Sequence, residues 1–388
     1  MFKCLSVVAA GSLALSAYGL IIIPTFDSSI TSDPSAAAIE AAINGAIHVL
    51  QSNLVDNVTV NVTFVSDETV GLGQSSTFGN DVAYSAFLTA LKSHAASARD
   101  TTALSKLPNS STDPVIGGTQ IHVTTAQARV LGLNTSYTGP DSTVSCKMSL
   151  MNFTRPPGDP NKYDLQQVLE HELDEVLGIS SALPDTSEIW PVDLFRYTTN
   201  LVRTFTTSGD DAYFSTDGAN LIARYNMNSG GDYADWWSYS SNWSPATGIS
   251  LAYPQVQDAF SGPGNALDLG AAELAALDVV GWTLATASAT PPALMIVRSG
   301  ANQFTLSWPN TASGYVLQER TDLNSGAWAF STSGSANPAV LVSATSQKFY
   351  RLYKPAAVGK SPAQNGAVVS SPHGPLTITT RSLQPRQP

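Results

Sequence analysis

The amino-acid sequence predicts an α+β domain followed by a small all-β domain. Helix-type and strand-type patterns alternate through residues 20–282, which is typical of a domain that mixes both element types. At residues 283–292 the composition shifts to Ala, Thr, Ser and Pro, as in an interdomain linker. Short strand-like runs follow, so we expect a β-sandwich at residues 293–355 and a disordered tail at residues 356–388.

Strand and helix patterns open the larger domain in turn. Residues 21–26 are mostly apolar and predict a strand. Residues 35–50 carry a helical pattern that begins after Asp33-Pro34, and Pro is favoured at the first helical positions. Residues 58–65 alternate apolar with polar side chains, which predicts a half-buried strand.

The alternation continues toward the middle of the chain. We expect a helix-rich stretch over residues 81–107, a short strand at residues 120–123 and a helix at residues 126–131. Residues 145–153 alternate again and lead into a Pro-rich loop at residues 155–160. This order of elements favours an α/β arrangement within the larger domain.

Two well-marked helices complete the larger domain. The first is predicted to start near Asp164, whose carboxylate can cap it, and to end at Gly178 in a left-handed turn. The second covers residues 268–280 and is stopped by Gly281.

Six short β-like runs make up the predicted smaller domain. They are residues 294–297, 303–308, 314–319, 327–331, 340–343 and 349–353. Turn residues separate them and no helical pattern intervenes, which favours a β-sandwich. The residues from Ala356 onward are rich in Ser, Pro, Gly and Gln, and therefore predict disorder.

Composition and the chain start exclude some classes of function. The net charge is −11 and no basic cluster occurs, which argues against a nucleic-acid partner. Residues 1–19 resemble a cleaved secretory signal: Lys3 precedes an apolar stretch that ends at Ala17-Tyr18-Gly19. We therefore expect a secreted, extracellular protein that is not held in a membrane after cleavage.

The helix that begins at Asp164 contains the candidate metal ligands and the candidate general base. His171 and Glu175 are one turn apart and share a face, which is how the two ligands of a zinc-binding HExxH helix are arranged. Glu175 stands where that motif has its second His, and carboxylate is an accepted zinc ligand. Glu172 falls among apolar residues and is predicted to be a shielded general base, whereas Glu170 and Asp174 are expected to face solvent.

The segment resembles secreted bacterial metalloproteases with a zincin-like or metzincin-like fold, whose helix carries an HExxE pattern. The resemblance covers nearly all of residues 20–282 and rests on several blocks in order. They are residues 22–30, the His171 helix, residues 193–197, 212–218, 230–236 and 273–282. The resemblance implies a zinc metalloendopeptidase that hydrolyses protein or peptide substrates through a metal-bound water, with Glu172 as base.

The third metal ligand is left open by the motif helix. Ser181 stands where a metzincin has its third ligand and is a poor one; Asp185, Glu188 and Asp193 follow, and we favour Asp193. Asp193 and Tyr197 together resemble the acid and tyrosine of aspzincin-type peptidases, which implies that Tyr197 donates to the developing oxyanion. The alternative for Asp193 is a helix cap or an ion pair with Arg196.

The ligand set has a chemical consequence. One His and two carboxylates bring a bound Zn²⁺ to about neutral, so its water is acidified less than in a three-His site. We therefore expect an alkaline-shifted profile or weak hydrolysis. An oxygen-rich site of this kind also suits Mn²⁺.

The β-domain resembles fibronectin type III-like modules of bacterial secreted proteins, in residues 304–308, 315–319 and 349–352. The resemblance implies a spacer or an adhesive part that contacts a surface or a polysaccharide. The alternative function of the whole chain is therefore a catalytically inactive, peptidase-like binding or adhesion protein.

Three further features are open between a functional and a structural role. His122 could reach a metal site or be a satisfied core histidine. Met227 could form a methionine floor below a metal or fill the core. The aromatic run at residues 233–243 could bind sugar, line a substrate cleft or pack in the core.

Overall fold

The computed structural model has 28% of its residues in helices and 27% in strands, so the chain is of the mixed α+β class. It describes residues 19–133, 137–209, 211–238, 254–285, 294–300, 303–308, 316–321, 328–331, 339–342, 348–353 and 376–385. The predicted signal, apart from Gly19, and most of the predicted linker lie outside these residues. Among the described helices, none has both the length and the hydropathy needed to cross a bilayer.

The largest sheet has six strands, in the order β1-β2-β5-β3-β18, with β4 also paired to β3. These strands are β1 (Ile21–Phe26), β2 (Thr59–Ser66), β5 (Ser142–Cys146), β3 (Gly73–Ala83), β18 (Leu376–Thr379) and β4 (Gln120–Thr124). β1, β2 and β5 run parallel, whereas β3 is antiparallel to β5, β4 and β18. The alternation that predicts β2 is reproduced by burial, because Val60, Val62 and Phe64 are almost fully buried.

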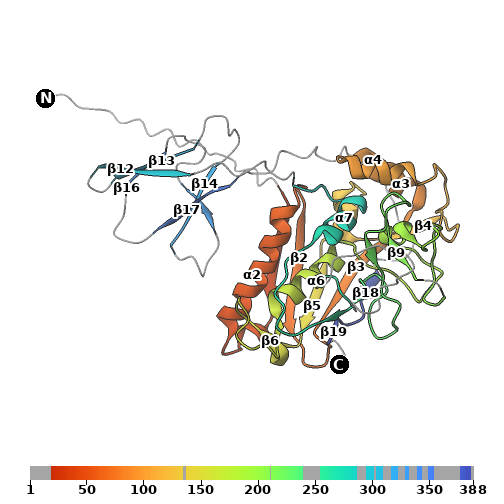
Figure 1. Ribbon diagram of the computed structural model, residues 1–388, viewed down its shortest axis with the longest axis horizontal. Helices are drawn as coiled ribbons and strands as arrows, with labels where there is room; N and C mark the ends of the chain where they lie inside the picture. Colours follow the sequence, from red (N-terminus) through yellow and green to blue (C-terminus); the bar gives the residue numbers. More distant parts are fainter. Residues whose placement is uncertain are drawn as a thin grey trace.

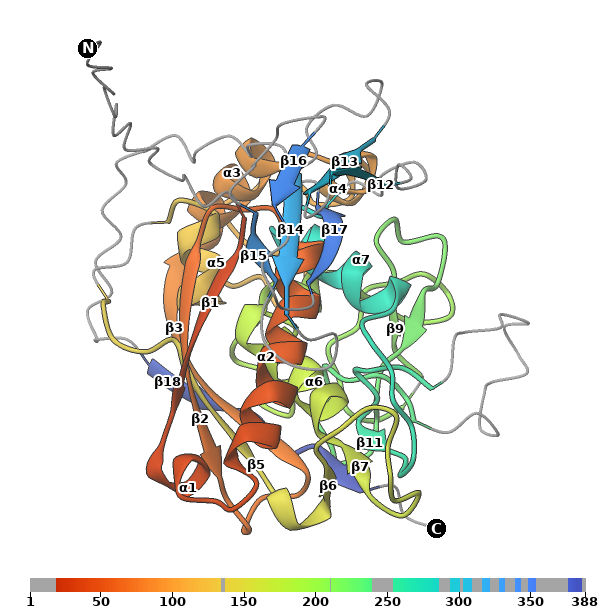
Figure 2. The same ribbon diagram turned by 90° about the vertical axis from the view of Figure 1, so that its left-hand side faces the viewer.

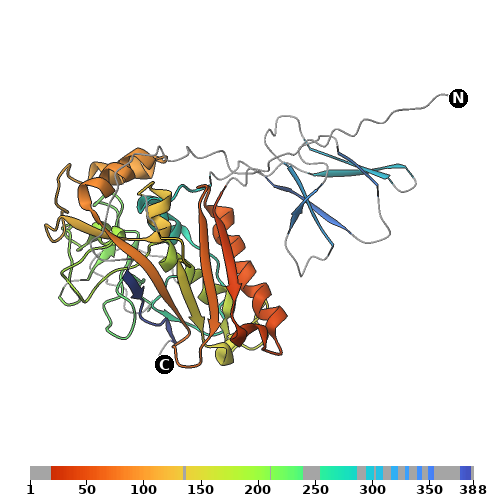
Figure 3. The same ribbon diagram turned by 180° about the vertical axis from the view of Figure 1, so that it is seen from behind.

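Two long helices lie side by side on one face of this sheet (Figures 1 and 3). They are α2 (Ala36–Asn53) and α6 (Leu165–Leu177). The other helices are α1 (Ser28–Thr31), α3 (Tyr84–His94), α4 (Ala98–Ser105), α5 (Thr125–Val130), α7 (Ala271–Val279) and two short 3₁₀ helices, η1 (Met148–Leu150) and η2 (Pro191–Phe195). The predicted helices at residues 35–50, 126–131 and 268–280 thus correspond to α2, α5 and α7.

The ends of α6 are those that the sequence predicts. The carboxylate of Asp164 accepts the backbone N–H of Gln167 at 3.1 Å. Gly178 has a φ of 116°, and a Cβ there would also collide with the side chain of Gln127. Since glycine is the residue that fits both conditions, α6 ends at this position.

The prediction that Glu170 and Asp174 of α6 face solvent is wrong. Glu170 and Asp174 are buried, as are almost all residues of the helix. Glu170 accepts the backbone N–H of Leu269 at 2.9 Å, and the chain that leads into α7 covers this side. The helix therefore crosses the interior instead of lying on a surface.

Two stretches of the sheet were not predicted as strands. β3 contains many small polar residues, and its last part falls in the stretch expected to be helix-rich. The described residues 376–385 contradict the expected disorder of the tail. They form β18 on the edge of the main sheet and β19 (Gln384–Pro385), which runs parallel to β11 (Phe260–Ser261).

Short strands also occur just before α6 and between α6 and α7. They are β6 (Met151–Asn152), β7 (Tyr163–Asp164), β8 (Arg196–Tyr197), β9 (Tyr213–Phe214) and β10 (Ala223–Arg224). β8, β9 and β10 form a small antiparallel sheet. The bridge between Tyr225 and Trp236 extends this region toward residue 235, which matters for the site.

The described residues between 295 and 353 form two three-stranded antiparallel sheets, which Figure 1 shows to one side of the main body. The strands are β12 (Met295–Gly300), β13 (Gln303–Ser307) and β16 (Ala339–Val342) in one sheet, and β15 (Ala329–Phe330), β14 (Val316–Arg320) and β17 (Phe349–Tyr353) in the other. Leu306, Trp308, Leu317 and Ala339 form a hydrophobic cluster separate from the main core. Six strands thus correspond to the six predicted runs.

Candidate metal centre

Helix α6 brings two of the predicted ligands together with a third that the sequence did not indicate. One ligand atom each of His171, Glu175 and Asp235 lies within 4.8 Å of the other two, and all three residues are buried. His171 Nε2 is 3.8 Å from Glu175 Oε1 and 3.6 Å from Asp235 Oδ1. One imidazole and two carboxylates are a ligand set for a divalent cation.

The orientation of the His171 ring is set by the chain at residue 256. Nδ1 lies 3.0 Å from the carbonyl oxygen of Val256, so it donates its proton there. Nε2 then carries the lone pair, and the side-chain nitrogen of Gln257 lies 3.5 Å from it, at about the same distance as the carboxylates of Glu175 and Asp235. A backbone carbonyl that fixes the tautomer in this way is the usual second partner of a metal-binding His.

Asp235 is held in place from two sides. Its backbone carbonyl accepts the N–H of Asn226 at 2.7 Å, which joins it to the chain beyond β10. Its Oδ1 accepts from the side chain of Gln257 at 3.0 Å. The next residue, Trp236, is buried and packs against Phe214 and Tyr225. The aromatic side chain thus anchors the segment that presents the third carboxylate.

Strand β3 forms the opposite wall of the site. The hydroxyl of Ser75 donates to Glu175 Oε2 at 2.9 Å. A Cβ at Gly73 would collide with the Glu172 carboxylate, so the backbone of β3 lies directly against it. The glycine is needed because the strand and the acid approach so closely.

Glu172 lies next to this group, beside the carboxyl of Glu175 and the backbone of β3. It is completely buried, and neither carboxylate oxygen has a partner at hydrogen-bond geometry within the described part of the chain. Burial raises the pKa of Glu172 well above its usual value, the neighbouring Glu175 carboxyl and Ser75 backbone offset part of this rise, and the charges of Asp235 and Asp232 raise it further. Asp174, two residues farther along α6 and therefore on another side of the helix, is also buried without a hydrogen-bond partner among the described residues, and its acidic neighbours are Glu273, Glu170 and Glu175.

The electrostatics of the three ligand-type residues fit a divalent cation. Burial lowers the pKa of His171 to about 4 and raises those of Glu175 and Asp235 well above the usual range. His171 is therefore neutral at physiological pH and cannot compensate the two acids. A cation placed among them would stabilise both carboxylates in their charged form.

Asp193, the predicted third ligand, is placed elsewhere. Its Oδ2 accepts the backbone N–H of Trp190 at 2.9 Å, so it caps η2, which is the alternative that the sequence left open. Burial raises the pKa of Asp193 to about 7. It is not part of the group around His171, where Asp235 stands in its place.

Tyr197, the predicted oxyanion donor, lies in β8. Its ring is buried and the guanidinium of Arg203 stands over it, 5.1 Å from the centroid. Burial raises the pKa of its hydroxyl. No described contact joins Tyr197 to His171, Glu175 or Glu172.

A second group of ligand-type atoms surrounds His122. Its Nδ1 lies 2.9 Å from both Asp81 Oδ1 and Glu188 Oε1, and its ring stacks on Trp190. Both are hydrogen-bond distances from one ring nitrogen, so the single N–H of Nδ1 is shared between the two acids. We therefore interpret this group as a buried histidine with acidic partners.

The His122 group predicts a pH dependence of stability. Burial opposes protonation of the ring, but the hydrogen bonds to Asp81 and Glu188 outweigh it and raise the pKa of His122. A raised folded pKa contributes stability that is complete below the unfolded pKa and is lost as the pH rises through the folded pKa. The free energy of unfolding should fall across this range in the wild type and less in Glu188→Gln. Glu68→Gln, which changes an exposed Glu, is the control. Equal pH profiles for all three proteins would contradict the assignment.

The remaining sequence features have structural surroundings. Met227 Sδ lies 3.3 Å from a guanidinium nitrogen of Arg196 and packs against the main core. In the aromatic run, Tyr233 and Trp236 are buried, whereas residues 239–243 lie outside the described part of the chain.

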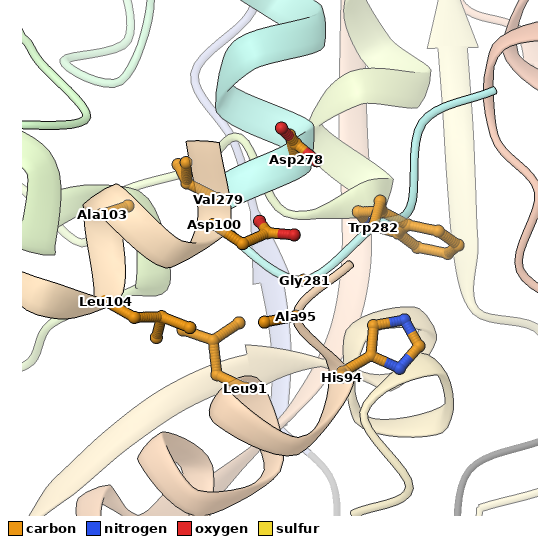
Figure 4. A pocket seen from close by; sticks show the side chains of 10 residues that line it. All are labelled: Leu91, His94, Ala95, Asp100, Ala103, Leu104, Asp278, Val279, Gly281 and Trp282. Carbon is orange, nitrogen blue, oxygen red and sulfur yellow. The ribbon is translucent and has the colours of Figure 1, made fainter. Parts of the chain in front are cut away.

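Two hollows lie outside the His171 group. One, lined in part by His94, Asp100 and Asp278, has about 10 Å³ of room, which suits a single water (Figure 4). The other measures about 170 Å³ and includes Val256, whose carbonyl accepts from His171, but none of the three ligand-type residues. The candidate chemistry is therefore not in either hollow.

Comparisons with known proteins add no assignment. No family model, curated protein or solved structure matches this chain.

Proposed function

We propose that this chain is a secreted, metal-dependent peptidase. The observation that carries the proposal is the group of His171, Glu175 and Asp235, buried beside the unpartnered carboxylate of Glu172. An imidazole and two buried acids, next to a further acid of raised pKa, are typical of a hydrolytic metal site. The resemblance to HExxE-type metalloproteases supports the substrate class, protein or peptide.

Each residue has a role in this proposal. His171, Glu175 and Asp235 would hold the metal, with Val256 fixing the imidazole and Ser75 orienting Glu175. A bound Zn²⁺ supplies Lewis acidity, which polarises a carbonyl and lowers the pKa of a water. Glu172 would take up a proton from the attacking water and return it to the leaving amine.

The donor set guides the choice of metal. Two carboxylates and one neutral imidazole bring a divalent cation to about neutral charge, which makes it a weaker acid than a three-His site. We therefore propose Zn²⁺, with Mn²⁺ as the second candidate, and an alkaline-shifted activity profile. We also propose a zincin-like core for residues 20–282 and a fibronectin type III-like β-sandwich for residues 293–355.

A catalytically silent binding protein is the second candidate. His171, Glu172 and Glu175 are each at most 1% exposed, so a substrate cannot reach them in this conformation. The β-domain, which has its own core around Leu306 and Trp308, would then be the working part that contacts a surface or a polysaccharide.

Metal content and chelator sensitivity test the peptidase proposal. Purified protein should contain close to one divalent ion per chain. It should hydrolyse a fluorogenic peptide mixture, lose this activity in chelator and regain it with Zn²⁺ or Mn²⁺. Metal-free protein with the same thermal stability in chelator and in Zn²⁺ would contradict the proposal, because a bound ion stabilises the folded state.

A further inference from the structure

The described C-terminal segment, residues 376–385, lies against three walls of the candidate metal centre. β18 pairs antiparallel with residues 76–79 of β3, and Figure 2 shows the two strands side by side. Farther on, Thr380 donates its N–H to the carbonyl of Ser75 at 2.9 Å. Leu383 donates to the carbonyl of Gly73 at 2.9 Å and is itself almost fully buried.

These contacts reach the site residues directly. The hydroxyl of Thr380 lies 3.3 Å from that of Ser75, whose hydroxyl donates to Glu175. Gly73, to which Leu383 is paired, is the residue that lies against Glu172. The segment thus covers the strand that forms one wall of the site.

The same segment also reaches the wall that carries Asp235. Arg381 donates to the carbonyl oxygen of Ser229 and its guanidinium stands 5.1 Å from the centroid of the Tyr233 ring. Beyond it, β19 pairs with β11 at Phe260 and Ser261. A single stretch of chain therefore bridges β3, the turn at residues 229–233 and β11.

The segment occupies the place that an extended peptide would use. β18 is the terminal strand of the main sheet, and β4 pairs only with residues 79–83 of β3. Without residues 376–383, the backbone of β3 near residues 73–79 would be an open sheet edge beside Glu172 and Glu175. Open edges bind extended peptides by adding a strand.

We propose that residues 376–385 are an internal lid, which a peptide substrate must displace from β3 before it can reach the site. This inference rests on the proposed peptidase function. It adds an inactive state, in which residues 376–385 block access to the site. It explains how a peptidase can have His171, Glu172 and Glu175 buried, because the chain's own residues 376–383 take the place of a substrate on the edge of β3.

Leu383→Asp tests the lid. A charge at this buried position should expel the segment, because the carboxylate has no partner there. Ile296→Asp is the matched control, since Ile296 is 59% exposed in β12. The main readout is the rate at which diethyl pyrocarbonate modifies His171 in metal-free protein, followed by mass spectrometry. It should rise on the order of tenfold for each 1.4 kcal/mol lost from the closed state, and remain unchanged in Ile296→Asp.

Two additions keep the test decisive. A synthetic peptide of residues 374–386, at about 1 mM, should slow His171 modification in Leu383→Asp again, whereas a scrambled peptide should not. If Leu383→Asp unfolds the protein, Arg381→Ala serves instead, because it removes the contacts to Ser229 and Tyr233 without burying a charge. Unchanged modification in the folded variants, or no effect of the peptide, would overturn the lid.

The readout separates the two proposals. His171 modification does not require hydrolysis, so fast modification without peptidase activity in Leu383→Asp would support the lid and contradict the peptidase. Fast modification together with a rise in kcat/KM would support both.

Discussion

Glu172→Gln should abolish most peptide hydrolysis while the protein keeps its metal and its fold. A general base contributes about 10²–10⁴-fold to such reactions, so kcat should fall by that factor. Metal content should stay the same, because Glu172 is not among the three ligand-type residues. The measurements are steady-state hydrolysis and metal analysis of the same preparation.

The stability of this variant separates catalysis from structure. Burial raises the folded pKa of Glu172 above its unfolded value, so this carboxyl destabilises the metal-free fold as the pH rises past the unfolded pKa. Glutamine has no such cost, and metal-free Glu172→Gln should be at least as stable as the wild type at pH 7. Glu40→Gln, a Glu outside the site, controls for the general effect of the substitution. Loss of stability in parallel with activity would indicate a structural role.

Asp235→Ala should release the metal, whereas Asp193→Asn should not. Loss of a partner that only supports a ligand already costs about 10–100-fold in metal affinity, so loss of a ligand should cost at least about 100-fold. Asp193 caps η2 and lies outside the ligand group, so its variant should bind metal normally with a modest loss of stability. Competition with a chromophoric chelator measures both affinities.

The outcome of this pair is informative in either direction. If Asp193→Asn lost the metal and Asp235→Ala kept it, the geometry around His171 would be wrong and the sequence-based choice of ligand correct. Normal metal binding in both variants would mean that the third ligand lies outside the described residues or that Glu172 serves as one.

Much of the fold follows from local patterns, and the misses share a cause. β1, β2 and the ends of α6 were predictable because apolar alternation and capping residues act over short distances. β3 was missed because its small polar residues face a carboxylate and a second chain segment, which local patterns do not encode. Similarly, β18 and Leu383 gain their order from pairing with β3, about 300 positions away in the sequence.

The candidate site likewise contains residues that local patterns predict and one that they do not. His171 and Glu175 could be found from helical spacing alone, since one turn of helix brings them together. Asp235 could not, because it enters through the packing of Trp236 on Phe214 and Tyr225. Its block, residues 230–236, was among those that resemble the metalloproteases, and this was the available signal.

The placement of Asp235 also bears on the stability of the folded chain. Cys146 is the only cysteine in the described part of the chain, and it is buried and unpaired. An ion shared by Glu175 and Asp235 would close a long loop much as a disulfide does, and a covalent bridge of that span is worth roughly 3–5 kcal/mol in the chain-entropy account. The proposed centre would then act as a reversible cross-link, so that the supply of metal would set the stability of the folded protein as well as any hydrolytic activity.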